Sequence, residues 1–259
     1  MRIAVLADLH ANLPALRAVL ADVAATGCEA IWCAGDVVGR GPHPNEVVEE
    51  LRRLDIPTVQ GNWDEAIGMG REVTGTIWPS PDAEAGGYAS LAWTGSQLSE
   101  ENRAWLRQLP ATMRLEIPGR TALLFHGTPL KQHEYLWEDR PSRYFARIAA
   151  DEGDDLFCFG HTHEGYHRVL GQAHFVAAGS VGCCTGQGAH ARYAVVYVTE
   201  TDVVVGFRNV EYDEAPLLRD MAAAGLSPDL LHVAPVPHPL VDPGTLPAGE
   251  APAIAPSAS

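Results

Sequence analysis

Short apolar runs alternate with segments of helical periodicity at the start of the chain, and no other feature restricts the fold as strongly. Residues 2–7 and 30–34 are mostly apolar stretches of the kind that form buried strands. The segment 13–25 between them repeats apolar side chains at helical spacing, and a second helix is predicted over 44–54. A third strand is predicted over 57–60. This order is typical of parallel strands with helices on their faces.

Glycine-containing turns separate strand patterns in the second half of the chain. Gly119-Arg120 and Gly171-Gln172 have the composition of hairpin turns, which join antiparallel strands. Further helices are predicted over 141–151 and 213–224. We therefore predict an α/β fold with mixed sheets. The strands expected in this half are residues 112–117, 121–125, 155–159, 165–170, 173–177, 191–198 and 202–210.

A single domain is predicted over residues 1–226. The length of 259 residues and the apolar content of 46% both fit one globular domain. Residues 62–110 have no strong strand pattern, so we expect a helical insertion near the site, with helices over 84–97 and 99–109. Residues 227–259 contain eight of the 19 prolines. We expect an extended or disordered tail there, because such a composition buries too little apolar surface to offset the entropy of ordering.

Residue types that bind metal ions follow five of the predicted strands. The carboxyl ends of strands in an open α/β sheet meet at one crevice, so these side chains are expected to gather there. Their mixture of oxygen and imidazole donors suits Mn, Fe, Zn, Co or Ni, with manganese favoured, and it speaks against a site for Mg or Ca alone. The candidate ligands are Asp8, His10, Asp36, Asn62, His126, His161 and His163.

Five short motifs of the chain, taken in order, resemble those of the calcineurin-like metallophosphoesterases. The likeness is strongest to the small bacterial and archaeal phosphodiesterases, and it extends to the diadenosine-tetraphosphatase and protein-phosphatase branches. It covers roughly residues 1–210. The resemblance implies a four-layer α/β/β/α sandwich of two mixed sheets with a dinuclear metal centre. The motifs are DLH (8–10), GDVVGRG (35–41), GNWD (61–64), HG (126–127) and GHTH (160–163).

The same resemblance assigns the ligands to two divalent transition-metal ions. Asp36 would bridge both ions. A hydroxide between the ions would then attack phosphorus in line with the leaving group. The ligands implied are Asp8, His10 and His163 for the first metal, and Asn62, His126 and His161 for the second.

Net charge limits the partners that we expect. Lys and Arg number 18 against 33 Asp and Glu, which gives a formal charge of −15. Such a surface repels polyanions, so we expect no long nucleic acid, and a DNA nuclease of the same superfamily is disfavoured. Two divalent ions together outweigh the negative charges of Asp8, Asp36 and one hydroxide. The centre would therefore stay positive enough to attract a small phosphate ester.

The sequence also predicts a cytoplasmic protein without a membrane partner. No apolar run approaches the roughly 18 residues that a membrane helix needs. The run from Ile3 to Ala7 ends at Asp8 and is too short for the core of a secretory signal. The sequence leaves a homo-oligomer open. Reduced thiols are expected, because no disulfide-framework spacing relates Cys28, Cys33, Cys158, Cys183 and Cys184.

Arg40 is a candidate for both catalysis and substrate binding. It lies in GDVVGRG at the position where protein phosphatases carry an arginine on the substrate phosphate. A guanidinium group can bind two phosphate oxygens at once. The alternative is a surface arginine in a turn before Pro42.

Position 63 departs from the family pattern, in which a histidine protonates the leaving oxygen and a following acid orients it. Trp63 cannot supply that proton at neutral pH. Asp64 and Asn62 remain as candidate catalytic residues, and His133 is a weaker candidate for the missing acid. Trp63 either stacks on an aryl group or nucleobase of the substrate or packs in the core. We expect weak activity on esters with poor leaving groups and better activity on activated esters or anhydrides.

Two functions from different classes follow from these observations. The first is a dinuclear metal-dependent phosphoesterase that hydrolyses small phosphodiesters, nucleotides or phosphoproteins through a metal-bridging hydroxide. The second is a catalytically weak or inactive metal-binding scaffold for protein partners, which the tryptophan at position 63 favours. The complete ligand set favours the enzyme, because a scaffold does not need every ligand.

Overall fold

Strand β1 (Arg2–Leu6) is buried on both faces in the computed structural model of the chain, and this burial sets the order of the layers. Side chains of a strand alternate between its two faces. Ile3 and Val5 belong to the apolar core between the two sheets. Ala4 and Leu6 belong to a second core between the sheet and its helices. A strand covered on both sides needs apolar residues throughout, as the sequence has here.

The first sheet contains β1 as an inner strand and is mixed. Its order is β2-β1-β8-β9. Val5 of β1 pairs with Trp32 of the parallel strand β2 and with Ala194 of the antiparallel strand β8. The added strands are β2 (Ala30–Cys33), β8 (His190–Val198) and β9 (Val203–Glu211).

The second sheet is also mixed and faces the first across the shared core. Its order is β3-β4-β5-β7-β6, with parallel pairs in the middle and an antiparallel hairpin at each edge. The predicted turns at Gly119 and Gly171 join these hairpins, both with positive φ. The strands are β3 (Thr112–Ile117), β4 (Arg120–Phe125), β5 (Leu156–Phe159), β6 (Gly165–Leu170) and β7 (Ala173–Ala178).

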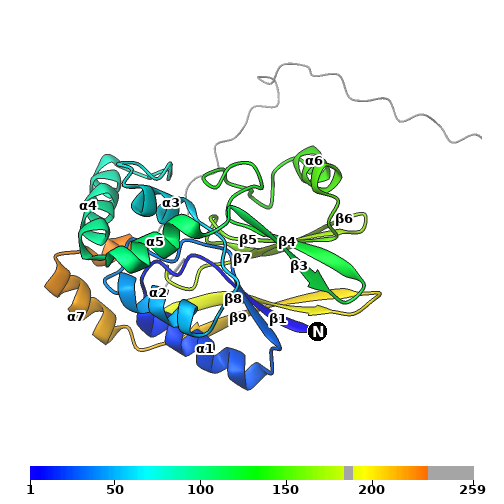
Figure 1. Ribbon diagram of the computed structural model, residues 1–259, viewed down its shortest axis with the longest axis horizontal. Helices are drawn as coiled ribbons and strands as arrows, with labels where there is room; N and C mark the ends of the chain where they lie inside the picture. Colours follow the sequence, from blue (N-terminus) through cyan, green and yellow to red (C-terminus); the bar gives the residue numbers. More distant parts are fainter. Residues whose placement is uncertain (184–188, 233–259) are drawn as a thin grey trace, which may run out of the picture.

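Helices cover the outer face of each sheet, so the fold has the predicted α/β/β/α layers (Figure 1). Helices α1 (Leu13–Thr26) and α2 (Pro44–Arg53) pack on the first sheet, and α6 (Ser142–Glu152) packs its Phe145 on the second. Residues 1–183 and 189–232 are the part of the chain that the structure describes. Within that part, no helix is both long and apolar enough to cross a bilayer.

One predicted strand is wrong. Residues 57–60 form a single bridge between Thr58 and Cys33 and no strand. Pro57 has no N–H to donate to a ladder. The N–H of Gln60 turns away to the carbonyl of Pro110, 2.8 Å distant. The other predicted strands are confirmed to within one residue at each end.

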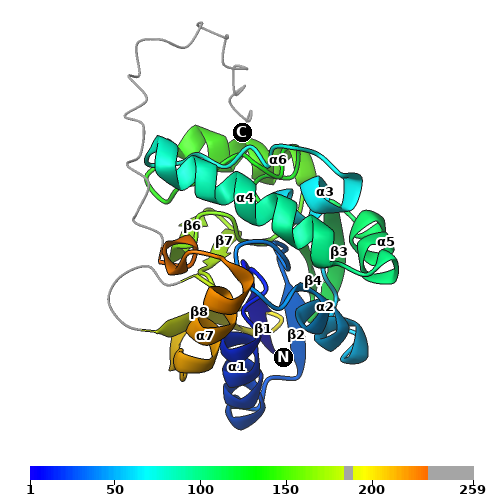
Figure 2. The same ribbon diagram turned by 90° about the vertical axis from the view of Figure 1, so that its left-hand side faces the viewer.

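The insertion contains three helices instead of the predicted two. The helix that the sequence analysis missed is α3 (Asn62–Met69), which is short and begins inside the GNWD motif. It is followed by α4 (Pro81–Gln97) and α5 (Glu100–Gln108), which correspond to the predicted pair. All three gather at one end of the sandwich (Figure 2).

The folded domain extends past residue 226, where the tail was predicted to begin. Helix α7 (Ala215–Ala224) is followed by a 3-10 turn, Pro228–Leu230. Leu230 and Leu231 are buried against Leu217 of α7. The segment folds onto the domain because these two leucines provide apolar side chains to bury, which its proline-rich composition alone did not indicate. The rest of the predicted tail, 233–259, lies outside the described residues.

Truncation of Leu231 tests this extension of the domain. Leu231 is 1% exposed, so Leu231→Ala should lower the free energy of unfolding by about 2 to 5 kcal/mol, as for other buried leucines. Leu130, which is 84% exposed, provides the control. Leu130→Ala should change the free energy of unfolding by about 0.5 kcal/mol or less. Urea unfolding of the full chain measures both. Equal, small effects would show that the segment contributes nothing to the fold.

Candidate metal centre

Strand ends from both sheets bring the seven predicted ligands together. Asp8 follows β1 and Asp36 follows β2, while His126 follows β4 and His161 follows β5. Asn62 is the first residue of α3. These strands run parallel within each sheet, so their carboxyl ends lie at the same edge.

The backbone at five of these ligands has an unusual conformation. A positive φ disfavours any residue with a Cβ by about 1 kcal/mol or more, and such strain is typical of functional sites. Hydrogen bonds hold the strained loops, with Asp8 N donating to Gly35 O and His10 N to Asp36 O, both at 2.9 Å. The five are Asp8 (φ 54°), His10 (44°), Asp36 (52°), His161 (71°) and His163 (60°).

Asp36 lies between two groups of potential ligands. Its Oδ2 is 3.7 Å from His10 Nε2 and 3.3 Å from His126 Nε2. With Asp8 and His10 it forms one group whose ligand atoms all lie within 4.8 Å of one another, and with His126 and His161 it forms another. A shared carboxylate is what a bridge between two ions requires.

The remaining ligands extend each group. His163 Nε2 lies 3.2 Å from His10 Nε2 and 3.5 Å from Asp8 Oδ1. Asn62 Oδ1 lies 3.0 Å from His126 Nε2. The structure therefore brings all seven predicted residues together at one site.

Hydrogen bonds outside the centre aim the ligand atoms inward. His126 Nδ1 contacts the carbonyl of Ala34 at 2.7 Å, which leaves Nε2 for the centre. The amide nitrogen of Asn62 donates to Thr74 O at 2.9 Å, which leaves Oδ1. Outer partners of this kind orient metal ligands.

The imidazole of His161 indicates whether these residues fit a metal ion. Its Nε2 is buried and has no hydrogen-bond partner within residues 1–183 and 189–232. A buried polar atom without a partner is costly, and a cation beside it would remove that cost. The donor set and its orientation therefore fit divalent metal ions.

Burial controls the protonation of the centre. Burial raises the pKa of Asp8 to about 8, although the neighbouring His126 opposes this shift. Burial also lowers the pKa values of His10, His161 and His163 far below the ordinary range, so these imidazoles are neutral, the form that binds metal. For His126, burial lowers the pKa, but the carboxylates of Asp36 and Asp8 outweigh it and raise the pKa to about 9.

Asp64, a candidate catalytic residue, uses both of its carboxylate oxygens to bind backbone N–H groups. One carboxylate oxygen accepts the N–H groups of Val37 (2.9 Å) and Val38 (3.2 Å), and the other accepts Gly61 N at 2.9 Å. Burial raises its pKa to about 7. Asp64 thus holds the loop that carries Asp36, which makes it a positioning residue.

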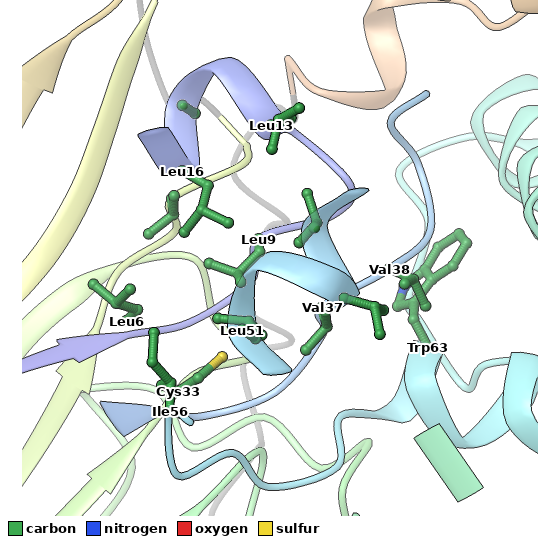
Figure 3. Packing of buried hydrophobic residues seen from close by; sticks show 14 of the residues in the cluster. Leu6, Leu9, Leu13, Leu16, Cys33, Val37, Val38, Leu51, Ile56 and Trp63 are labelled. Atoms are coloured by element: carbon green, nitrogen blue, oxygen red, sulfur yellow. The ribbon is translucent and has the colours of Figure 1, made fainter. Parts of the chain in front are cut away.

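Trp63 is packed in the core and has no free face for a substrate ring. Its side chain is 1% exposed and lies beside Val38 (Figure 3). Its ring meets the imidazole of His10 edge-on at 5.9 Å. The predicted stacking on a substrate is therefore wrong for this arrangement, because protein atoms already cover the indole.

Arg40 is buried, and not all of its hydrogen-bond donors have a partner among the described residues. It is 4% exposed, and its guanidinium carbon lies 5.3 Å from the ring centroid of Trp63 and 5.1 Å from that of Trp78. Nη1 donates to Leu230 O at 3.2 Å, whereas Nε has no partner within the described chain. Arg40 lines a cavity of about 320 Å³ between α4 and the C-terminal turn.

The sequence analysis missed one residue beside the centre. Cys183 was expected to be an ordinary thiol, but its sulfur lies with the ring nitrogens of His10 and His163 in a third group of potential ligands. The signal was available, because Cys183 follows the end of β7 as the other ligands follow their strands.

Known proteins resemble the chain in sequence and in fold. The family model described as the calcineurin-like phosphoesterase superfamily domain matches residues 1–201. A metallophosphoesterase from Sphaerobacter thermophilus is 31% identical with a TM-score of 0.68, over 89% of this chain and 96% of that one. A hypothetical protein from Pyrococcus horikoshii shares the fold, with a TM-score of 0.75 at 23% identity over 89% of this chain and 96% of that one.

A curated relative matches a smaller part. An uncharacterized protein of Methanocaldococcus jannaschii is 34% identical over 158 residues, which are 61% of this chain and 58% of the relative. The match therefore spans less than two thirds of that protein's length.

Metal affinity should rise with pH. Asp8, with its pKa of about 8, and His126, with its pKa of about 9, hold protons at neutral pH and must release them to become ligands. Below these pKa values, metal affinity should rise by up to about tenfold per pH unit for each group that must lose a proton. Calorimetric titration of the metal-free protein with Mn²⁺ should give tighter binding near pH 8.5 than near pH 6.5, with protons released to the buffer. Equal affinities would contradict the protonation states described here.

Proposed function

The chain belongs to the calcineurin-like phosphoesterase superfamily, and we propose that it is a metal-dependent phosphoesterase that works with two divalent transition-metal ions. The observation that carries this proposal is the position of Asp36, which is shared between two groups of potential ligands. Bound ions would lower the pKa of a water molecule and neutralise charge on the phosphate oxygens.

Under this proposal, the side chains have separate tasks. Asp8, His10 and His163 would hold one ion, Asn62, His126 and His161 would hold the other, and Asp36 would hold both. The N–H of Trp63 donates to Asp36 Oδ1 at 2.9 Å, which leaves Oδ2 facing the imidazoles. The N–H of His161 donates to both oxygens of Asp8, at 3.2 and 3.0 Å, and fixes that carboxylate.

Arg40 is the group that we propose for the substrate phosphate. Burial lowers the pKa values of His10 and His163, and the positive charge of Arg40 lowers them further. Its Nε, which has no partner among the described residues, is available to a phosphate oxygen. The tryptophans beside it limit its movement, so the guanidinium is positioned before substrate binds.

The substrates proposed are small phosphodiesters or nucleotides with good leaving groups, and phosphoproteins remain a further class. The net charge of −15 disfavours long polyanions. Indole at position 63 cannot protonate a leaving oxygen, so substrates whose leaving group needs no proton should react faster.

Removal of the shared carboxylate tests the proposal. Asp36→Asn should lower the metal-stimulated hydrolysis of bis-p-nitrophenyl phosphate by about 100-fold or more, because neither ion keeps its full set of ligands. Asp151→Asn, at an exposed aspartate on α6, should leave the rate unchanged. Wild-type protein that binds metal but hydrolyses no phosphate ester would instead support the scaffold.

A second substitution tests the role of position 63. Trp63→His should raise turnover of alkyl phosphates relative to p-nitrophenyl phosphate. The indole at this position lies edge-on to His10, and an imidazole in its place could protonate a poor leaving group. Trp63→Phe is the matched control, since it also loses bulk but cannot donate a proton. The readout is the ratio of the two turnover numbers. An unchanged ratio in Trp63→His would refute the explanation based on the leaving group.

A further inference from the structure

We infer that Cys183 supplies a sulfur ligand to the first metal position, beside His10 and His163, and that this position favours zinc, cobalt or iron over manganese. The inference rests on the proposed function, because it concerns an additional ligand of the same centre. It replaces the expectation of manganese that came from oxygen and imidazole donors alone.

The sulfur lies within reach of the two imidazoles. Cys183 Sγ and one ring nitrogen each of His10 and His163 all lie within 4.8 Å of one another. The two Nε2 atoms are 3.2 Å apart. His10 is fully buried, Cys183 is 2% exposed and His163 is 9% exposed, so an ion among them would be shielded from solvent. Three potential ligands around one point are the start of a metal site.

Hydrogen bonds lock the turn of Cys183 onto the loop that carries Asp8. Ser180 Oγ accepts the N–H of Cys183 at 2.9 Å and donates to Asp8 O at 3.0 Å. Gly182 N also donates to Asp8 O, at 2.8 Å. A Cβ at residue 182 would clash with Leu9 O, so only glycine permits this close approach.

A second connection fixes the same turn from the side of α1. Asn12 Nδ2 donates to Gly182 O at 2.9 Å, while Asn12 Oδ1 accepts Ala15 N and caps the helix. Cys183 therefore keeps its position relative to His10 without help from an ion. Preorganised ligands of this kind give a metal site its selectivity.

Sulfur changes which ions the position prefers. A thiolate is a soft donor that suits zinc, iron and cobalt, whereas manganese prefers oxygen. The Cys183 sulfur lies 4.0 Å from Leu230 O. As the bond between sulfur and metal forms, the S–H bond breaks and its proton passes to solvent.

Cobalt titration of the full chain tests the inference. The metal-free protein, kept reduced and without oxygen, is titrated with Co²⁺ and followed by absorption. Visible d–d bands report that an ion is bound, and a near-ultraviolet charge-transfer band reports a thiolate on that ion. Wild-type protein should show both. Cys183→Ser should keep the visible bands and lose the near-ultraviolet band, and its zinc affinity should fall by about 10- to 100-fold with little change for manganese.

Matched variants and a second measurement separate the outcomes. Cys158→Ser, in β5, and Cys184→Ser should keep both bands. X-ray absorption of the zinc-loaded wild type needs no variant and should show a zinc–sulfur distance of about 2.3 Å. Visible bands without the near-ultraviolet band, or loss of that band in Cys184→Ser alone, would overturn the inference and leave the proposed function intact. No bound cobalt at all would overturn the proposed function itself.

Discussion

A buried carboxylate surrounded by imidazoles is the constraint on which the rest of the structure depends. Asp36 is 2% exposed and lies within 4 Å of ring nitrogens from both sheets. Its backbone carbonyl binds His10, and its side chain binds the first turn of α3. A Cβ at Gly61 would clash with that carboxylate, so the glycine of the GN motif is required there. Ions that contact this cluster would offset the cost of burying so many polar groups.

The second layer of support around the centre comes from residues that are not themselves predicted ligands. Asp64 holds the loop of Asp36, and Trp63 contacts both His10 and Arg40. The carbonyl of Leu230 accepts a hydrogen bond from Arg40, so the C-terminal turn closes this side of the site. Without this turn, Arg40 would lose the one hydrogen-bond acceptor that it has within the described residues. The last described turn of the domain is thus connected to Arg40, the residue that we propose binds the substrate phosphate.

Much of this structure could be predicted because strand and helix patterns indicate the α/β class, the family resemblance implies the four layers, and parallel strands end at a common edge where the ligands gather. The failures had local causes. Helix α3 is short and begins within a motif, so its periodicity was not recognised. Residues 57–60 do not form a strand, because Pro57 has no N–H to donate and Gln60 N donates to Pro110 O instead. The roles of Trp63 and Cys183 depend on packing between distant segments, which a pattern of residue types does not contain. The backbone partners of Asp64 likewise come from two separate segments, the loop of Asp36 and Gly61.

The most direct test is a crystal structure of the zinc-loaded full chain, with anomalous difference maps at the zinc edge. The account predicts two peaks about 3.5 to 4 Å apart, both within bonding distance of the Asp36 carboxylate. A single peak, or two peaks that do not share Asp36, would contradict a centre bridged by this residue.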